Sequence, residues 1–322
     1  MKFGVRLPNS GPFATTNSFF RIAKESAKLK YDSLWVHDHM HWGMEDATHF
    51  AAGAYEVVRH DERQNFFESI TTLAHLSSIE NIRFGVAAVV LPFRSPIAVA
   101  RQHATLHELT GGRMILGVCP GGIEHEFERL HLDHKTRGSV TEEYMEVINL
   151  LFSDEPEVSY DGEHFKMTNV EFYPKPKNLR MWYGAHPSTR TARRVAQYTN
   201  GWMPAYLIPD QFEEMVAKIG RYAVKFGKDP DDFDICHETY ICIADTQKEV
   251  EDISRLSMKH IFNEEKHEKV FLMGTPDTIT EKLNKYAKAG VNYFEIKFLS
   301  HSVDQMLEMI ELFSDEVKPK FS

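Results

Sequence analysis

The stretch IRFGVAAVVLPFRSPIAVARQHATLHELTGGRMILGVCPGG, residues 82–122, decides the fold. Phe84 to Leu91 is a short apolar run rich in valine, which is typical of a parallel strand buried on both faces. A helix is expected from Pro96, because proline suits the first helical turn and apolar residues then repeat at helical spacing. A glycine pair ends this helix, and Met114 to Val118 is predicted to be a second strand. Strand, helix and strand in so short a span predict a parallel crossover unit.

The same alternation of strand and helix patterns continues along the whole chain. Eight apolar runs are predicted to be strands: Phe3–Leu7, Ser33–His37, Phe84–Leu91, Met114–Val118, Arg180–Gly184, Gly201–Met203, Asp234–Ile243 and Tyr293–Phe298. A hairpin with Asp161-Gly162 as its turn is expected as an insertion over Val158–Val170. Eight strands with helices between them predict a (β/α)8 TIM barrel with loop and hairpin insertions. No Pro/Ser-rich linker divides the chain, so one domain over residues 1–322 is expected.

Composition restricts the class of partner. The formal net charge of −10 argues against a nucleic-acid or anionic-membrane binder, because either needs a basic face. Met1 leads directly into the first predicted strand and no apolar run has membrane-spanning length, so a cytoplasmic protein is expected. The cysteines are Cys119, Cys236 and Cys242, which lack metal-type spacing and are expected to be reduced.

Two strand ends carry the residues that are the best candidates for binding or catalysis. Parallel α/β folds bind ligands at the carboxyl ends of their strands. Cys119–Gly122 is a backbone-rich loop at one such end, and HDHMHW, residues 37–42, is the most polar strand end in the chain. Side chains alternate along a strand, so His37, His39 and His41 are predicted to share a face if the strand continues.

Several segments together resemble the luciferase-like monooxygenase family, which includes bacterial luciferase and deazaflavin-dependent oxidoreductases. They are GVAAVVLPFRSPIAVARQHATLHELTGGRMILGVCPGG, YDSLWVHDHMHW, EYMEVINLLF, MWYGAHPSTRTARRVAQYTNGW and GTPDTITEKLNKYAKAGVNYFEI. The resemblance follows the chain in order over nearly its full length. It implies a TIM barrel, usually a homodimer, that binds FMN or the deazaflavin coenzyme F(420) at the carboxyl ends of the strands.

The resemblance also implies which residues bind the cofactor. Ala87 and Ala88 match the bulge that supports the flavin ring, often through a non-proline cis peptide, and their small side chains suit a backbone that touches a ring. Gly184, Ser188 and Thr189 match the phosphate end, where the N–H groups and dipole of a helix start favour an anion. Without the resemblance, the alanines would be ordinary core residues and Ser188 an ordinary helix cap.

The remaining site residues come from the same resemblance. His39 matches the catalytic histidine beside the reacting edge of the cofactor, where an imidazole can give or take a proton. Asp38 before it, and Cys119 and Gly121 in the glycine loop, are expected at the cofactor. Trp42 is expected to form a wall of the substrate pocket. The alternatives are a structural histidine at position 39 and a tryptophan that only packs.

The sequence leaves the cofactor open between coenzyme F(420) and FMN. In the family that the chain resembles, an Asp-His pair is more frequent among deazaflavin users, so Asp38-His39 favours the deazaflavin and therefore hydride transfer with a small organic substrate. An FMN enzyme would instead need a flavin reductase as partner and O2 as co-substrate. Gly122 replaces the glutamate of family members that oxidise a sugar phosphate, and Pro120 replaces the arginine of bacterial luciferases, so neither of those substrates is indicated.

Two other classes of protein are compatible with parts of the pattern. His37-x-His39 at a strand end is how several TIM-barrel hydrolases hold zinc, with His186 and His237 as candidates for further ligands. No suitable ligand set follows from the sequence, so no metal is expected. A non-catalytic flavin-binding relative is the third possibility.

Overall fold

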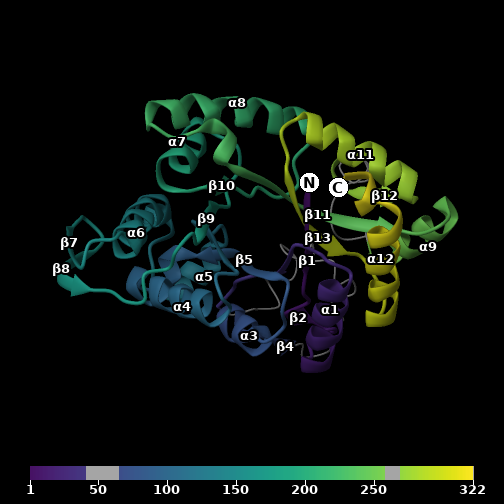
Figure 1. Ribbon diagram of the computed structural model, residues 1–322, viewed down its shortest axis with the longest axis horizontal. Coiled ribbons are helices and arrows are strands. Elements are labelled where there is room, and N and C mark those ends of the chain that lie inside the picture. Colours follow the sequence, from purple (N-terminus) through teal and green to yellow (C-terminus); the bar gives the residue numbers. More distant parts are fainter. Residues whose placement is uncertain (41–64, 258–268, 322) are drawn as a thin grey trace.

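The computed structural model describes residues 1–40, 65–257 and 269–321, and its core is a closed parallel barrel (Figure 1). The barrel strands are β1 (Lys2–Arg6), β3 (Ser33–Val36), β5 (Arg83–Val90), β6 (Met114–Cys119), β9 (Arg180–Tyr183), β10 (Gly201–Trp202), β11 (Asp234–Ile243) and β13 (Tyr293–Phe298). Around the barrel they follow the order β10-β9-β6-β5-β3-β1-β13-β11, and pairing of β10 with β11 closes the circle. The predicted (β/α)8 TIM barrel is confirmed.

Helices surround the barrel, as the ribbon drawing shows (Figure 1). They are α1 (Thr16–Lys28), α3 (Ser69–Leu76), α4 (Pro96–Leu109), the short α5 (Glu124–Arg129), α6 (Arg137–Phe152), α7 (Thr189–Tyr198), α8 (Pro209–Lys225), α9 (Gln247–Ser257), α11 (Pro276–Lys288) and α12 (Val303–Glu316). Proline occupies the first turn of α4, α8 and α11, as its fixed φ favours. Serine caps the N-terminus of α7 and of α12.

The segment that begins at residue 65 differs from its prediction. A helix from Phe66 was expected, but Phe66 belongs to β4 (Asn65–Phe66), which pairs antiparallel with β2 (Ser10–Gly11). Helix α3 begins later because the Glu68 carboxylate accepts a hydrogen bond from the Thr71 N–H at 2.6 Å. This cap is typical of a helix start and fixes the boundary.

Two smaller additions lie outside the barrel circle. The predicted hairpin is present as β7 (Glu157–Asp161) and β8 (Lys166–Glu171), and its turn is the four-residue loop 162–165 rather than Asp161-Gly162. A short strand that was not predicted, β12 (Leu272–Gly274), pairs with the carboxyl half of β11. Neither addition interrupts the barrel.

The lower part of the barrel interior is filled by aromatic rings. Trp35 and Trp182 lie 5.2 Å apart between ring centroids, and Tyr293 makes edge contacts with both. Trp35 is fully buried because Gly4 and Gly85 leave room for it: a Cβ atom at either glycine would collide with its indole. Large rings opposite glycines therefore form the floor of the barrel.

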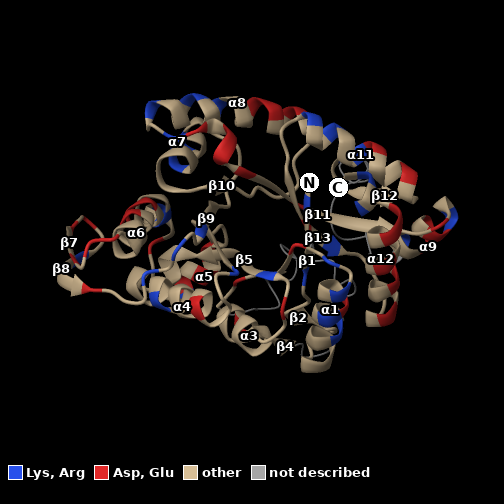
Figure 2. Cartoon of the chain, viewed as in Figure 1, with Lys and Arg blue, Asp and Glu red and all other residues tan. Residues whose placement is uncertain are grey.

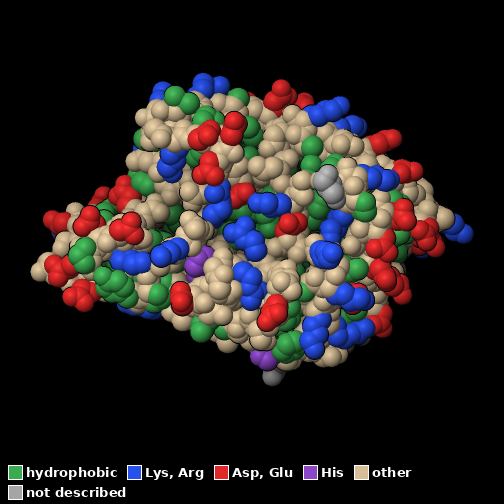
Figure 3. Space-filling view, viewed as in Figure 1, with side chains coloured by type: hydrophobic (Ala, Val, Ile, Leu, Met, Phe, Trp, Pro, Cys, Tyr) green, Lys and Arg blue, Asp and Glu red, His purple; other side chains and the backbone are tan. Residues whose placement is uncertain are grey.

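Charged side chains are distributed over the outer surfaces. Figure 2 shows both basic and acidic residues on α8 and α11, and only acidic ones among the charged residues of α12. On the face of the molecule drawn in Figure 3, basic side chains gather near the centre and acidic ones are more frequent toward the left and right edges. Among the described residues, no helix is both long enough and apolar enough to span a membrane.

Candidate active site

The bulge in β5 forms one side of the barrel mouth. The register of β5 against β6 shifts between Val86 and Val89, and the peptide bond between Ala87 and Ala88 is cis. Arg6 donates from Nη2 to the Ala87 carbonyl at 3.2 Å. The Cys119 thiol donates to the Ala88 carbonyl, with sulfur 3.6 Å from oxygen. Both carbonyls of the bulge are thus held from the barrel side, and the bulge expected from the family resemblance is present.

Gly184 lies against the same bulge. A Cβ atom placed on Gly184 would be 3.5 Å from the Ala88 Cβ and 3.6 Å from the Cys119 Cβ. The structure therefore brings Ala87, Ala88, Cys119 and Gly184 together as a flat bed of small groups, which we call the alanine bed. Burial raises the pKa of the Cys119 thiol to about 12, so the thiol is protonated and serves as a hydrogen-bond donor.

Gly121 is required by the backbone conformation of the loop after β6. Its φ is +77°, a backbone conformation that L side chains rarely adopt. A Cβ atom there would also press against Val90 and Phe127. Glycine at this position therefore permits the tight turn that leads from β6 into α5.

His39 stands at the mouth and is paired with a glutamate from another loop. Its Nδ1 lies 2.9 Å from Glu126 Oε2, and the other Glu126 oxygen accepts from the Met40 N–H at 3.3 Å. The Glu126 side chain is 2 % exposed, whereas His39 is 13 % exposed. Glu126 is thus a buried carboxylate that fixes the orientation of a histidine open to the mouth. Sequence reasoning missed Glu126, although its position on a short helix after the β6 glycine loop was a usable signal.

Asp38 is a buried carboxylate whose hydrogen bonds connect two strand ends. Its oxygens accept hydrogen bonds from Arg94 Nη1 and Nη2 at 2.6 Å each, from Ser69 Oγ at 2.9 Å and from the Val90 N–H at 3.1 Å. Such a bidentate guanidinium pair is strong and directional. The carboxylate thereby joins the end of β3 to the end of β5, directly beside His39.

His37 lies between His39 and the charged groups of the barrel. Burial, and after it the positive charge of Arg6, keep the pKa of His37 well below its usual value, so its ring is neutral. The two histidine rings are 5.8 Å apart. Their shared face was predicted from a longer strand, but β3 ends at Val36 and the following residues leave the strand conformation. His41 and Trp42 lie outside the described residues.

The upper barrel interior contains four charged side chains that the sequence reading did not single out. Arg6 pairs with Glu295, and Lys297 pairs with Glu238. Arg6 also lies 3.4 Å from Glu238, which links the two pairs. Burial alone would raise the pKa of Glu238, but Lys297 and Arg6 beside it hold that pKa below its usual value. We call these four residues the charged cluster.

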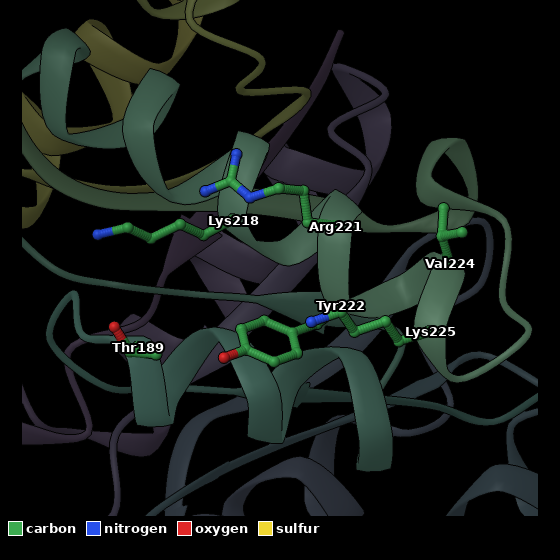
Figure 4. Close-up of a pocket in the computed structure, with 6 residues that line it drawn as sticks. All are labelled: Thr189, Lys218, Arg221, Tyr222, Val224 and Lys225. Carbon is green, nitrogen blue, oxygen red and sulfur yellow. The ribbon is translucent and has the colours of Figure 1, made fainter.

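The start of α7 is the expected phosphate end. Ser188 Oγ accepts from the Thr191 N–H at 3.0 Å, which leaves the N–H groups of Thr189 and Arg190 at the open end of the helix. A groove beside Thr189 is lined on α8 by Lys218, Arg221, Tyr222, Val224 and Lys225. In Figure 4 the basic groups of Lys218 and Arg221 extend to the same side of α8, above Thr189. Both groups bring positive charge toward the helix start, although the Lys218 ammonium also pairs with Glu214 at 2.6 Å.

The histidines considered as zinc ligands do not converge. His237 is fully buried and packs against Phe212, Tyr286 and Phe294 in the layer between barrel and helices. Burial lowers its pKa to about 3. His186 is exposed at the entry to α7. In the part of the chain that the structure describes, no three histidine, cysteine or carboxylate side chains come together as a metal site would require.

Known proteins share both the sequence pattern and the fold. The family model for luciferase-like monooxygenases matches residues 1–267. The 5,10-methylenetetrahydromethanopterin reductase of Archaeoglobus fulgidus is 23 % identical over 283 residues, which are 88 % of this chain and 73 % of the relative.

Solved structures with this fold include members bound to each of the two cofactors. An F(420)-dependent secondary alcohol dehydrogenase in complex with an F(420)-acetone adduct superposes with a TM-score of 0.81 at 16 % identity, covering 98 % of both chains. The oxygenating constituent of 3,6-diketocamphane monooxygenase from Pseudomonas putida, in complex with FMN, superposes with a TM-score of 0.76 at 17 % identity, covering 99 % of this chain and 98 % of that one.

The match of the family model over most of the chain, together with the barrel, shows the class. The chain belongs to the luciferase-like monooxygenase family and is an oxidoreductase of that family.

Proposed function

We propose that this protein transfers a hydride between coenzyme F(420) and a small organic substrate. The observation that carries the proposal is the position of the His39–Glu126 pair at the same barrel mouth as the alanine bed. A flat ring on the bed and a proton-transfer group beside it are what such a reaction requires.

The residues of the bed fit a flavin-type ring. Ala87, Ala88 and Gly184 present backbone and methyl groups only, so a planar ring can approach the bulge closely. The carbonyls of the bulge are already engaged by Arg6 and Cys119, so the backbone beneath the ring is fixed in advance. When bound, the cofactor would supply hydride exchange at a carbon of its central ring. Trp35 and Ile115 pack in one cluster with Ala87 and support the bed from below.

His39 is the residue that moves the proton. For an alcohol substrate, His39 would take the hydroxyl proton while the carbon gives up its hydride; in the reverse direction it would return that proton. Glu126 is a positioning residue that orients the imidazole of His39 through Nδ1. Asp38 positions the segment through Arg94 and does not itself need to touch the cofactor.

The start of α7 would hold the phosphate. Ser188 and Thr189 provide the helix start, and Lys218 and Arg221 on α8 add positive charge next to it. Gly184 in the bed precedes Ser188 by four residues, so one strand end would serve both the ring and the phosphate. The arrangement suits a phosphorylated cofactor with its ring on the bed.

A second candidate function is an FMN-dependent monooxygenase that uses O2 and reduced flavin from a reductase partner. The fold shared with the FMN-bound Pseudomonas putida protein favours it. The Asp38-His39 pair and the match to a methylenetetrahydromethanopterin reductase support the deazaflavin instead. With either cofactor, we propose a cytoplasmic homodimer that acts on a small molecule and binds neither nucleic acid nor membrane.

Titration of the pure protein with FMN and with coenzyme F(420), in separate experiments, tests the proposal. Trp35 and Trp182 lie close beneath the bed, so their fluorescence should change when a ring occupies it. We expect saturable binding of the deazaflavin and much weaker binding of FMN. The reverse preference would support the monooxygenase. Gly184→Val is the matched control, because its side chain would stand on the bed and should abolish binding of either ring.

A further inference from the structure

The charged cluster lies across the barrel from the alanine bed. In the order of strands around the barrel, β11 and β13 are opposite β5 and β6. Glu238 is on β11 and Lys297 is on β13, and both point into the barrel near its carboxyl end. A molecule that covers a ring on the bed must therefore face these side chains.

Exposure separates the cluster into a floor and a surface. Arg6 and Glu295 are buried, with 3 % and 0 % of their side chains exposed. Lys297 and Glu238 are 11 % and 15 % exposed and so reach the mouth. The inner pair holds the outer pair in place, because Arg6 also approaches Glu238 at 3.4 Å. The outer pair is consequently a fixed polar surface rather than two mobile side chains.

Tyr206 completes this surface from the loop after β10. Lys297 Nζ donates to the Tyr206 hydroxyl oxygen at 2.7 Å. The Tyr206 ring stacks on Tyr240 at 5.3 Å with an interplanar angle of 7°, and Lys297 Nζ lies 5.2 Å from both ring centroids. The ring and the ammonium therefore fix each other by a hydrogen bond and by cation–π attraction.

The backbone at Tyr206 indicates that this placement serves a purpose. Its φ is +59°, which is uncommon for an aromatic residue and unfavourable for any residue with a Cβ atom. Such conformations cluster at functional sites, because the surrounding structure must enforce them. The Tyr206 N–H donates to the Glu238 carbonyl at 3.1 Å, which ties the loop to the strand that carries the cluster.

The charges of the exposed pair balance, because Lys297 pairs with Glu238. In the floor beneath them Arg6 pairs with Glu295, whose pKa is raised by burial. A substrate phosphate or carboxylate would have to compete with Glu238 for Lys297 at close range. An uncharged oxygen does not carry this penalty, and it can take hydrogen bonds from an ammonium or a phenol.

We propose that Tyr206, Lys297 and Glu238 form the subsite that binds an uncharged alcohol or carbonyl oxygen of the substrate. Tyr206 and Lys297 provide the donors, and Glu238 is the acceptor that receives an alcohol O–H and excludes anions. The subsite rests on the proposed function for its role in hydride transfer, because it would place the oxygen-bearing carbon between the alanine bed and His39. Its binding preference stands on the charged cluster alone.

Binding of four probes of equal shape tests the subsite: cyclohexanol, cyclohexanone, cyclohexanecarboxylate and cyclohexylammonium. Their dissociation constants are measured by ligand-observed NMR on the protein without cofactor and again with coenzyme F(420) added. We expect the two uncharged probes to bind in preference to the two ions. Tyr206→Phe should weaken cyclohexanone about tenfold, the loss of one net hydrogen bond. Tyr160→Phe, on the distant hairpin β7–β8, is the matched control and should leave every constant unchanged.

Glu238→Gln gives the sharpest outcome. It removes the carboxylate that balances Lys297, so cyclohexanecarboxylate should become the preferred probe. Three outcomes would each overturn the proposal. The unmodified protein could prefer the carboxylate, or neither uncharged probe could bind up to its solubility. The third is an unchanged preference in a Glu238→Gln variant that circular dichroism shows to be folded. Failure of the proposed function is a separate result, seen as absence of deazaflavin binding in the cofactor titration while the probe preferences persist without cofactor.

Discussion

The lower and the upper halves of the barrel interior are built in opposite ways. The lower half contains Trp35, Trp182 and Tyr293, whose rings pack in contact and leave the floor closed. The upper half contains the charged cluster on one side and the small groups of the alanine bed on the other. The strands are the same in both halves, so the difference lies only in which side chains point inward at each level.

This difference separates stability from chemistry along one axis. Aromatic rings bury large apolar areas and stabilise the fold in the floor. Small groups and charges contribute less to stability, but they leave room for a ring and provide hydrogen bonds to ligands. The separation explains why a barrel mouth can be specialised without unfolding the protein. The predictions below test it from the largest expected change in free energy to the smallest.

Trp35→Ala should lower the free energy of unfolding by about 3–5 kcal/mol, because it leaves a large cavity in the floor. Chemical denaturation monitored by circular dichroism measures the change. Trp35→Phe retains a ring and is the control, with a smaller loss. A decrease below about 1 kcal/mol for the alanine variant would show that the floor does not carry the stability that we assign to it.

His39→Ala should reduce turnover roughly 100-fold or more, about 2.7 kcal/mol in the barrier, because the variant lacks the imidazole that transfers the proton. Stability and deazaflavin affinity should stay nearly constant, which is the opposite of the result for Trp35. The assay follows the absorbance of the deazaflavin during reaction with substrate.

Variants of the α5 glutamates refine the role of the pair. Glu126→Gln should lower turnover less than His39→Ala and shift its pH profile, because the carboxylate only orients the imidazole. Glu128→Gln changes an exposed neighbour on the same helix and should have no effect.

The catalytic role of His39 itself would be refuted if the His39→Ala variant turned over substrate as fast as the unmodified protein.

His237, whose ring packs between the barrel and the helices, should make the protein less stable in acid. Burial lowers the pKa of His237 in the folded state to about 3. Between pH 6.5 and about pH 3 the unfolded chain therefore binds a proton at this histidine that the folded chain does not bind. Stability is therefore highest above pH 6.5 and falls as the pH decreases. At pH 5 the loss from this group is about 2 kcal/mol.

Replacement of His237 tests this dependence. His237→Leu should flatten the decrease in melting temperature between pH 8 and pH 5. His186→Leu, at an exposed position, should leave the pH dependence as it is. Identical pH profiles for both variants would exclude His237 as the source.

Ser188→Ala should produce the smallest change, about 1 kcal/mol of stability from the lost N-cap of α7. If the phosphate binds there, the affinity for the deazaflavin should fall as well. Ser302→Ala removes the equivalent cap of α12, where Ser302 accepts from the Gln305 N–H at 3.1 Å, and should change stability without changing affinity. Equal cofactor affinities in both variants would show that the phosphate does not bind at the start of α7.

The order of the strands could be predicted because burial leaves a local record in the sequence. Apolar runs such as Phe84–Leu91 mark strands covered on both faces, and proline and glycine mark the helix ends between them. The prediction failed where a distant partner decided the local structure. Phe66 was assigned to a helix, but its pairing with the loop after β1 made it a strand.

The candidate site divides in the same way. The sequence by itself determined the barrel, because apolar runs and helix ends leave a local pattern. The Ala87-Ala88 bulge and the candidacy of His39 followed from the family resemblance, which short motifs at strand ends carry. Only the tertiary structure decided that Glu126 orients His39, that Asp38 connects two strand ends, and that Tyr206, Glu238 and Lys297 meet. The hydrogen-bonded partners in these contacts, such as Asp38 with Ser69 and Tyr206 with Lys297, are 31 to 91 positions apart in the chain and come together only when the barrel closes. Charge pairing across strands leaves no periodic trace, so no local pattern could have revealed it.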